Sequence, residues 1–175
     1  MDLGVVDMIT TDAIGEPGMR TFYLQARSGG DLVTVVVEKE QVVLLAQLVL
    51  ETLADLPVET GGAANPPELE DPVEPLFRAG KLSIGYDPDE DRFLLEITEF
   101  EPEIEDEEEE DPRSAPDGEP ESVRLWASRE QMLALSRRGA AVAERGRPTC
   151  RFCGNPMDPE GHVCPATNGH RAPRA

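Results

Sequence analysis

The sequence predicts an α+β fold built from two similar β-β-β-α halves. Two segments of helical length, residues 40–55 and 129–145, carry apolar residues at helical spacing. Short stretches rich in Val, Leu and aromatic residues, bounded by turn formers, precede each segment, which is typical of paired antiparallel strands. We therefore expect one continuous antiparallel sheet, or two such sheets, with both helices packed on the apolar face.

Turn signals and a helix-capping pattern locate the individual elements. The Gly29-Gly30 pair and the acidic turn Asp87–Asp91 each separate two strand-like stretches, so each predicts a hairpin. Ser128, followed three residues later by Gln131, predicts a capping box at the start of the second helix. The predicted strands are Thr21–Ala26, Leu32–Glu38, Leu82–Tyr86, Phe93–Phe100 and Val123–Ala127.

An internal similarity relates the two halves. Glu40-Gln41 matches Glu130-Gln131 at an offset of 90 residues, whereas residues 21–25 resemble residues 92–96 at an offset of 71. The offsets differ by 19 residues, about the length of an acidic segment that lies between the matched stretches. The similarity predicts a pseudo-symmetric domain. The alternative is that strand-then-helix patterns resemble one another by chance.

Composition divides the chain into a body, residues 1–146, and a cysteine-containing segment with a flexible basic tail, residues 147–175. Within the body, a linker rich in Pro, Gly and acids at residues 57–75 separates halves at about 3–56 and 76–146. Residues 101–121 include seven consecutive acidic residues. Because like charges repel one another and resist burial, this acidic loop is predicted to be disordered.

The net charge of −20 is unevenly distributed. From Arg137 onward, seven arginines face three acids, which gives +4, so the preceding residues carry −24. Such an acidic body repels the phosphates of nucleic acid, and only the tail suits a polyanion. No apolar stretch is long enough for a membrane helix, and residues 1–4 do not resemble a signal peptide, so we expect a cytoplasmic protein.

One motif near the C-terminus carries recognisable chemistry. All three cysteines fall within fifteen residues, an odd count that argues against a disulfide framework in the cytoplasm. Cys150 and Cys153 are separated by two residues, and His162 and Cys164 follow after a stretch of turn formers. Three thiolates and one imidazole form a closed tetrahedral shell, the pattern of structural Zn²⁺. The sequence therefore predicts a zinc knuckle with these four ligands.

Two alternatives to this ligand set remain open. His170 is a second candidate for the fourth ligand, although the turn formers around His162 favour the latter. A redox Cys-x-x-Cys motif normally opens a helix after a strand, whereas Gly154-Asn155-Pro156 follows the pair here and opposes a helix. Both histidines lie close to the cysteines, so no Ser/His/Asp or Cys/His nucleophile pair is available elsewhere, and no catalytic residue is predicted.

Several of these motifs together resemble a family of uncharacterised actinobacterial proteins. The resemblance rests on Gly15-Glu16-Pro17-Gly18-x-Arg20-Thr21-Phe22, on Glu38-Lys39-x-Gln41-Val42, and on Cys-Arg-Phe-Cys-Gly-x-Pro-Met-Asp-Pro-x-Gly-His-Val-Cys-Pro from Cys150. It spans essentially the whole chain. The family has been called a repeat protein, and the resemblance implies a bacterial cytoplasmic location and an equivalent cysteine motif. It implies no activity.

Two functional hypotheses follow. The first is a non-enzymatic interaction or adaptor protein whose zinc knuckle helps to hold a protein partner. The alternative is an enzyme or small-anion-binding component with a site between the two halves, where Arg20, Arg27, Lys39 and Lys81 supply cations. Neither the identity of the partner nor the oligomeric state follows from the sequence.

Overall fold

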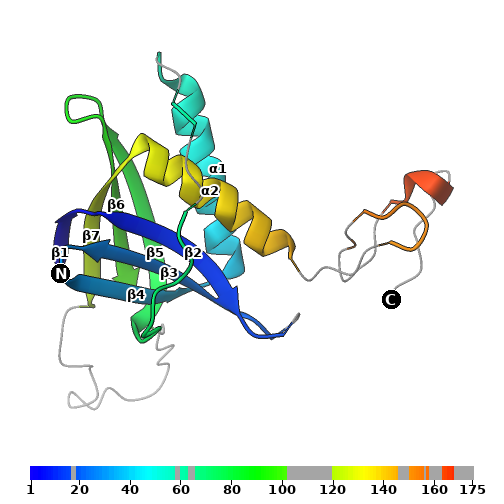
Figure 1. The fold of residues 1–175 in the computed structure, drawn as a ribbon, viewed down its shortest axis with the longest axis horizontal. Helices are drawn as coiled ribbons and strands as arrows, with labels where there is room; N and C mark the ends of the chain where they lie inside the picture. Colours follow the sequence, from blue (N-terminus) through cyan, green and yellow to red (C-terminus); the bar gives the residue numbers. More distant parts are fainter. Residues whose placement is uncertain are drawn as a thin grey trace, which may run out of the picture.

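A computed structural model describes residues 1–16, 19–57, 60–62, 66–101, 120–145, 150–155, 157 and 163–167. Seven strands form one sheet, and two helices lie against it (Figure 1). The strands are β1 (Asp2–Val5), β2 (Met8–Ile14), β3 (Thr21–Ser28), β4 (Asp31–Val37), β5 (Pro75–Asp87), β6 (Arg92–Glu99) and β7 (Ser122–Ser128). The helices are α1 (Lys39–Asp55) and α2 (Arg129–Glu144), with a short 3₁₀ turn at Pro165–Thr167.

The sheet is a curled ring whose two end strands are consecutive in the chain. The spatial order is β1-β7-β6-β5-β4-β3-β2. Only Val6 and Asp7 separate β1 from β2, and they join the two ends of the sheet: the Val6 N–H donates to the Trp126 carbonyl of β7, and the Asp7 N–H donates to the Arg27 carbonyl of β3. The polar backbone of both end strands is thereby partnered around this joint.

The mixed direction of the strands corrects the expectation of a purely antiparallel sheet. β1 runs parallel to β7, and β4 runs parallel to β5, whereas the other pairs are antiparallel. The physical reason is that α1 follows β4 and residues 56–74 return the chain before β5 begins. Parallel neighbours need such a crossover because a tight turn cannot connect them.

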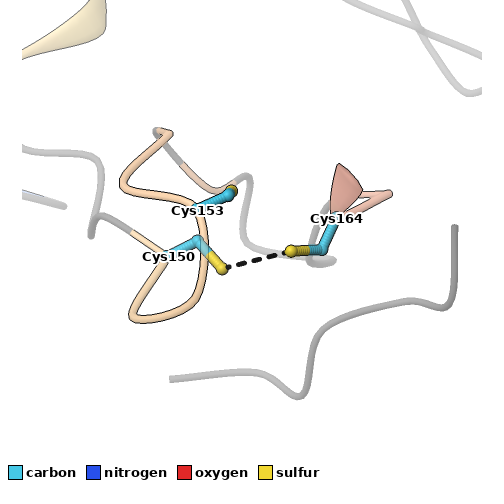
Figure 2. Close-up of side chains that lie close together, drawn as sticks. All are labelled: Cys150, Cys153 and Cys164. Carbon is cyan, nitrogen blue, oxygen red and sulfur yellow. Dashed lines mark hydrogen bonds between the residues drawn. The ribbon is translucent and has the colours of Figure 1, made fainter. Parts of the chain in front are cut away.

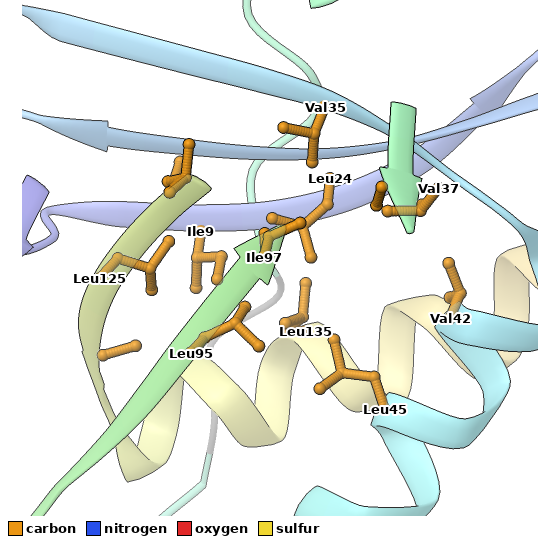
Figure 3. Packing of buried hydrophobic residues seen from close by; sticks show 14 of the residues in the cluster. Ile9, Leu24, Val35, Val37, Val42, Leu45, Leu95, Ile97, Leu125 and Leu135 are labelled. Carbon is orange, nitrogen blue, oxygen red and sulfur yellow. The ribbon is translucent and has the colours of Figure 1, made fainter. Parts of the chain in front are cut away.

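The hydrophobic core lies between the concave face of the sheet and the two helices. Figure 3 shows Leu45 of α1 and Leu135 of α2 close to Leu95 and Ile97 of β6. Phe93, Leu95, Ile97, Leu125 and Val49 are fully buried. Alternate residues of β6 and β7 are buried, which is why the apolar pattern of these two segments has a period of two. Both predicted helices and both predicted hairpins are confirmed.

The two strands β1 and β2 were not located individually by the sequence patterns. β2 reads Met-Ile-Thr-Thr-Asp-Ala-Ile and buries its first four residues in succession, so it lacks the simple alternation that marks a half-exposed strand. Thr10 and Thr11 are buried there as polar residues, each with a hydrogen bond to a backbone carbonyl.

Part of the linker is an ordered strap on the outer side of the sheet. The Thr10 hydroxyl donates to the Pro67 carbonyl at 2.6 Å. The amide of Gln25, which is completely buried, donates to the Glu70 carbonyl and accepts from the Glu70 N–H, at 2.9 and 2.7 Å. We call residues 66–70 the strap. The linker is therefore a structural element over this stretch.

Two further expectations concern the acidic loop and the absence of a membrane-spanning helix. Residues 102–119 of the predicted acidic loop lie outside the described residues, and the Glu99 N–H donates to the Glu121 carbonyl where the two ends of the loop meet. Across the described part of the chain, neither helix has the length and apolar character needed to cross a membrane.

Candidate metal centre

Three cysteine side chains converge near the C-terminus. The Sγ atoms of Cys150, Cys153 and Cys164 all lie within 4.8 Å of one another. Cys150 and Cys153 sit on one turn, and Cys164 faces them from the opposite side, with 3.8 Å between the sulfurs of Cys150 and Cys164 (Figure 2). None of the three forms a disulfide. The cluster can hold a metal ion, as its sequence spacing predicts.

The turn that carries the first two cysteines is closed by backbone hydrogen bonds. The Gly154 N–H donates to the Cys150 carbonyl at 2.7 Å, and the Cys150 N–H donates to the Asn155 carbonyl at 2.8 Å. Gly154 has φ of +74°, a left-handed conformation that glycine adopts without the Cβ penalty of other residues. This geometry brings both cysteines of the Cys-x-x-Cys pair to one side of the turn.

Backbone groups around the turn affect the two thiols differently. Burial raises the pKa of Cys150, but the backbone N–H groups of Phe152 and Cys153 stabilise its thiolate and lower the pKa overall. For Cys153, the backbone N–H of Asn155 acts to lower the pKa, while burial and the neighbouring thiols Cys164 and Cys150 outweigh it and raise the pKa. A cation between the three sulfurs favours the charged form of all of them.

The cysteines belong to a small apolar cluster separate from the main core. Cys150, Met157 and Cys164 are buried together, and Cys153 packs against them. Phe152 and Val163, in contrast, are 50% and 70% exposed. The guanidinium of Arg151 lies 4.8 Å from the centre of the Phe152 ring, so a cation and an aromatic face are displayed side by side. We call residues 150–167 the cysteine module.

Both candidates for a fourth ligand, His162 and His170, lie outside the described residues. The structure accordingly brings together three of the four predicted ligands. The choice between the two histidines stays a prediction.

The four cations proposed for a site between the halves have different surroundings. Arg20 donates to the Val142 carbonyl of α2 and lies over the Phe22 ring. Arg27 forms ion pairs with Asp7 and Glu70 beside the strap. Lys39 begins α1.

Lys81 lines a different cavity from Arg27, one that Leu44 and Leu48 of α1 also line. The structure therefore separates Lys81 from Arg27.

Two surface grooves were not predicted from the sequence. Asp7, Arg27, Gln131 and the strap residues line one of about 320 Å³, and α1 and β5 line a second of about 230 Å³. A sequence signal for the second did exist. Leu44 and Leu48 are spaced i, i+4 on α1 beside the face that enters the core, and they are 55% and 39% exposed.

A comparison with known protein families identifies the family to which the chain belongs. Residues 1–164 match the model of a family described as "Protein of unknown function (DUF3090)". The chain belongs to this family. The match ends at Cys164, so the family region of the chain includes all three cysteines of the cluster. No curated protein and no solved structure matches the chain.

Proposed function

We propose that the protein is a non-enzymatic interaction protein in which one structural Zn²⁺, bound by Cys150, Cys153, Cys164 and His162, folds a C-terminal recognition module. The observation that carries the proposal is the convergence of the three thiols. Two sulfurs that are each about 2.3 Å from a tetrahedral ion are about 3.8 Å apart. The Cys150–Cys164 separation of 3.8 Å has this value before any ion is added.

A structural rather than a catalytic ion is favoured by the predicted ligand set. Three thiolates and one imidazole complete a tetrahedral shell and leave no position for a reacting water. Within the described residues, this cysteine cluster is the one group of His, Cys, Asp or Glu side chains with metal-binding spacing. Among the described residues of the module, the buried side chains are Cys150, Met157 and Cys164, so metal binding would supply most of the free energy that orders it.

The body that carries the module is, we infer, a two-half repeat, as the sequence similarity suggests. Strand pairing supports this inference: Thr34 pairs with Pro75 and Arg124 pairs with Asp2 at the two parallel junctions, and these pairs correspond at offsets of 90 and 73 residues. The helix caps support it too. Gln41 donates to the Ala79 carbonyl and Gln131 donates to the Val6 carbonyl, at the same two offsets.

The recognition face of the module is proposed to be the exposed pair Arg151 and Phe152. An arginine stacked near an aromatic ring offers a cation, hydrogen-bond donors and apolar area together, a combination enriched at protein interfaces. Because the body is strongly acidic and the segment from Arg137 onward is basic, we expect a protein partner with an acidic, partly apolar surface.

The proposal is tested by metal analysis and affinity capture on the full-length chain. Protein purified without added metal is expected to hold one zinc ion per chain, as measured by inductively coupled plasma mass spectrometry. Cys164→Ser is expected to lose it. In native lysate of the source organism, the wild-type chain is expected to retain a partner that both Cys164→Ser and Phe152→Ala release.

The outcome for Phe152→Ala separates the two parts of the proposal. This variant keeps every metal ligand, so its zinc content is expected to match wild type while capture is lost. Absence of zinc from the wild-type protein would refute the metal centre. A full zinc complement with equal capture by wild type and Phe152→Ala would leave the ion in place and eliminate the recognition role of that face.

A further inference from the structure

The two surface grooves occupy corresponding places in the repeat, because each lies between a strand of one half and the helix of the other. The first is lined by β2 and α2 residues, among them Met8, Ile9 and Gln131. The second is lined by Lys81, Leu82 and Gln41 of β5 and α1. Met8 and Ile9 correspond to Lys81 and Leu82 at an offset of 73 residues, and Gln41 corresponds to Gln131 at an offset of 90. The same two offsets relate the strand pairings at the parallel junctions. The segment that borders the first groove is therefore informative about the second.

The strap borders the first groove. Pro66, Pro67 and Glu70 form one of its walls, and Thr10 and Gln25 of the sheet hold the strap by hydrogen bonds. The strap belongs to the segment that directly follows α1. It lies against the sheet and against α2, where Arg138 donates to the Pro66 carbonyl.

The second groove has no such wall. Every described residue that lines it comes from α1 or β5. Its lining is also more apolar: Leu44 and Leu48 stand at the positions of Ala134 and Arg138 in α2, the helix of the first groove. These two leucines are 55% and 39% exposed, and Leu82 and Ile84 are half-buried beside them. The groove is thus an apolar surface whose described lining lacks the strap wall of its counterpart.

A segment that resembles the strap and its flanking residues follows α2 in the sequence. At the offset of 90 residues, Asn65-Pro66 matches Asn155-Pro156 and Glu70 matches Glu160. Val73-x-Pro75 matches Val163-x-Pro165 at the same offset. The match overlaps the cysteine module. In the repeat, residues 156–160 of the module therefore stand at the position of the strap, and Val163 stands at the position of Val73, just after it.

Chain length and chemistry agree with this correspondence. Asp55 at the end of α1 and Glu144 at the end of α2 precede Pro66 and Pro156 by similar lengths of chain. Val163 is 70% exposed in the module, an apolar group without cover that suits the bare leucines. Ser83 lines the groove and keeps a hydroxyl at the position of Thr10, the residue that bonds the strap.

We propose that the groove lined by Leu44, Leu48, Leu82 and Ile84 is the docking site of this chain's own cysteine module, which forms a wall of it as residues 66–70 form a wall of the corresponding groove between β2 and α2. Docking covers the leucines and Val163 together and removes apolar surface from water on both sides. The inference goes beyond the proposed function, since it assigns a surface of the body and not a partner.

The test is nuclear magnetic resonance on the zinc-loaded full-length protein. Nuclear Overhauser contacts are expected between the Val163 methyls and the methyls of Leu44 and Leu48. Backbone ¹⁵N relaxation is expected to give the module the same rotational correlation time as the body. Leu48→Glu is expected to abolish those contacts and to shorten the correlation time of the module alone.

Matched variants keep the test specific. Leu50→Glu changes another exposed leucine of α1, 42% exposed and outside the groove lining, and is expected to leave the contacts intact. Val163→Ser is expected to act like Leu48→Glu from the other side of the interface. The Cβ shifts of the three cysteines report whether the module stays folded around its ion in every variant.

Three results would overturn the proposal: an independently tumbling module in the wild-type protein, equal effects of Leu48→Glu and Leu50→Glu, or contacts that arise only between differently labelled molecules, which would make a second copy the occupant. Failure of the adaptor proposal is distinguishable from all three. If Phe152→Ala captured the partner as well as wild type does, the adaptor proposal would fail, but the methyl contacts between Val163 and the two leucines would be unchanged.

Discussion

At the scale of single residues, the cysteine turn shows how a few backbone bonds prepare a metal site. Gly154 allows the chain to reverse, and two main-chain hydrogen bonds close the turn beneath Cys150. The donors that lower the pKa of Cys150 are the N–H groups of the same turn, so the fold that gathers the thiols also favours one of their charged forms. Local geometry and ligand chemistry are thus coupled here.

The fourth ligand is predicted at this scale. His162→Ala is expected to weaken zinc binding by more than about tenfold, because loss of a direct ligand costs at least as much as loss of a supporting one. His170→Ala is expected to leave the affinity unchanged. Competition with a chromophoric chelator measures both variants. The reverse ranking would assign the ligand to His170.

At the scale of elements, the first turn of each helix is tied to the sheet by one glutamine. Gln131 accepts from the Ser128 N–H and donates to the Val6 carbonyl, which lies at the joint between β1 and β2. Gln41 accepts from the Glu38 N–H and donates to the Ala79 and Gly80 carbonyls of β5. Each glutamine therefore caps a helix and also partners sheet backbone, at a register shift of β5 for Gln41 and at the joint between β1 and β2 for Gln131.

Removing one of these side chains is expected to lower stability measurably. Gln131→Ala loses both a cap bond and the partner of the Val6 carbonyl, so we expect a decrease of about 1–2 kcal/mol in the free energy of unfolding. Urea unfolding measures this decrease, provided that the dependence of the unfolding free energy on urea concentration is the same in both proteins. Glu130→Ala, an exposed change in the same turn, is the control and should cost less than about 1 kcal/mol. Equal costs would show that the glutamine has no special role.

The crossing of the two helices depends on a glycine. A Cβ at Gly139 of α2 would lie 2.9 Å from Cγ1 of Val42 in α1 and 3.5 Å from Cγ2 of Thr11. Gly139→Val is expected to destabilise the fold by about 1–3 kcal/mol through overpacking. Thermal and urea unfolding check this value.

A second substitution tests whether the helix contact is the cause. Val42→Ala in the Gly139→Val background is expected to recover part of the loss, so the two changes should be non-additive. The exposed Ala140→Val is the matched control for helix propensity alone, worth about 0.5 kcal/mol. Strict additivity would place the strain elsewhere.

At the scale of the whole molecule, the excess of acidic over basic side chains is the dominant electrostatic feature. Carboxylates outnumber basic residues by twenty, and ion pairs such as Arg78–Glu38 are exposed and contribute little. Raising the ionic strength from about 0.01 M to 0.15 M shortens the Debye length from about 30 Å to 8 Å, which screens the mutual repulsion of the acids. We expect the melting temperature to rise over this range.

Differential scanning calorimetry at constant pH measures the effect, with NaCl and KCl compared to separate screening from specific ion effects. A melting temperature that falls with salt would mean that favourable ion pairs outweigh the repulsion. The ion pair between Arg138 and Asp12, whose side chains are 14% and 19% exposed, would then be the first to examine.

The sequence by itself determined both helices, both hairpins and the cysteines that converge. Those features depend on neighbours in the chain: apolar spacing selects a helix, Gly29-Gly30 permits a tight reversal, and two residues between Cys150 and Cys153 bring the thiols together. Local physics is sufficient for them.

Only the tertiary structure decided the parallel junctions, the closure of the ring at Val6 and Asp7, and the strap. Gln25 looks like an ordinary polar strand residue, yet it is completely buried because Glu70, forty-five positions away, supplies both of its backbone partners. The bare groove beside Leu44 and Leu48 likewise exists only once α1 lies against β5. Such features depend on which distant segments meet, and no local pattern of residues encodes that choice.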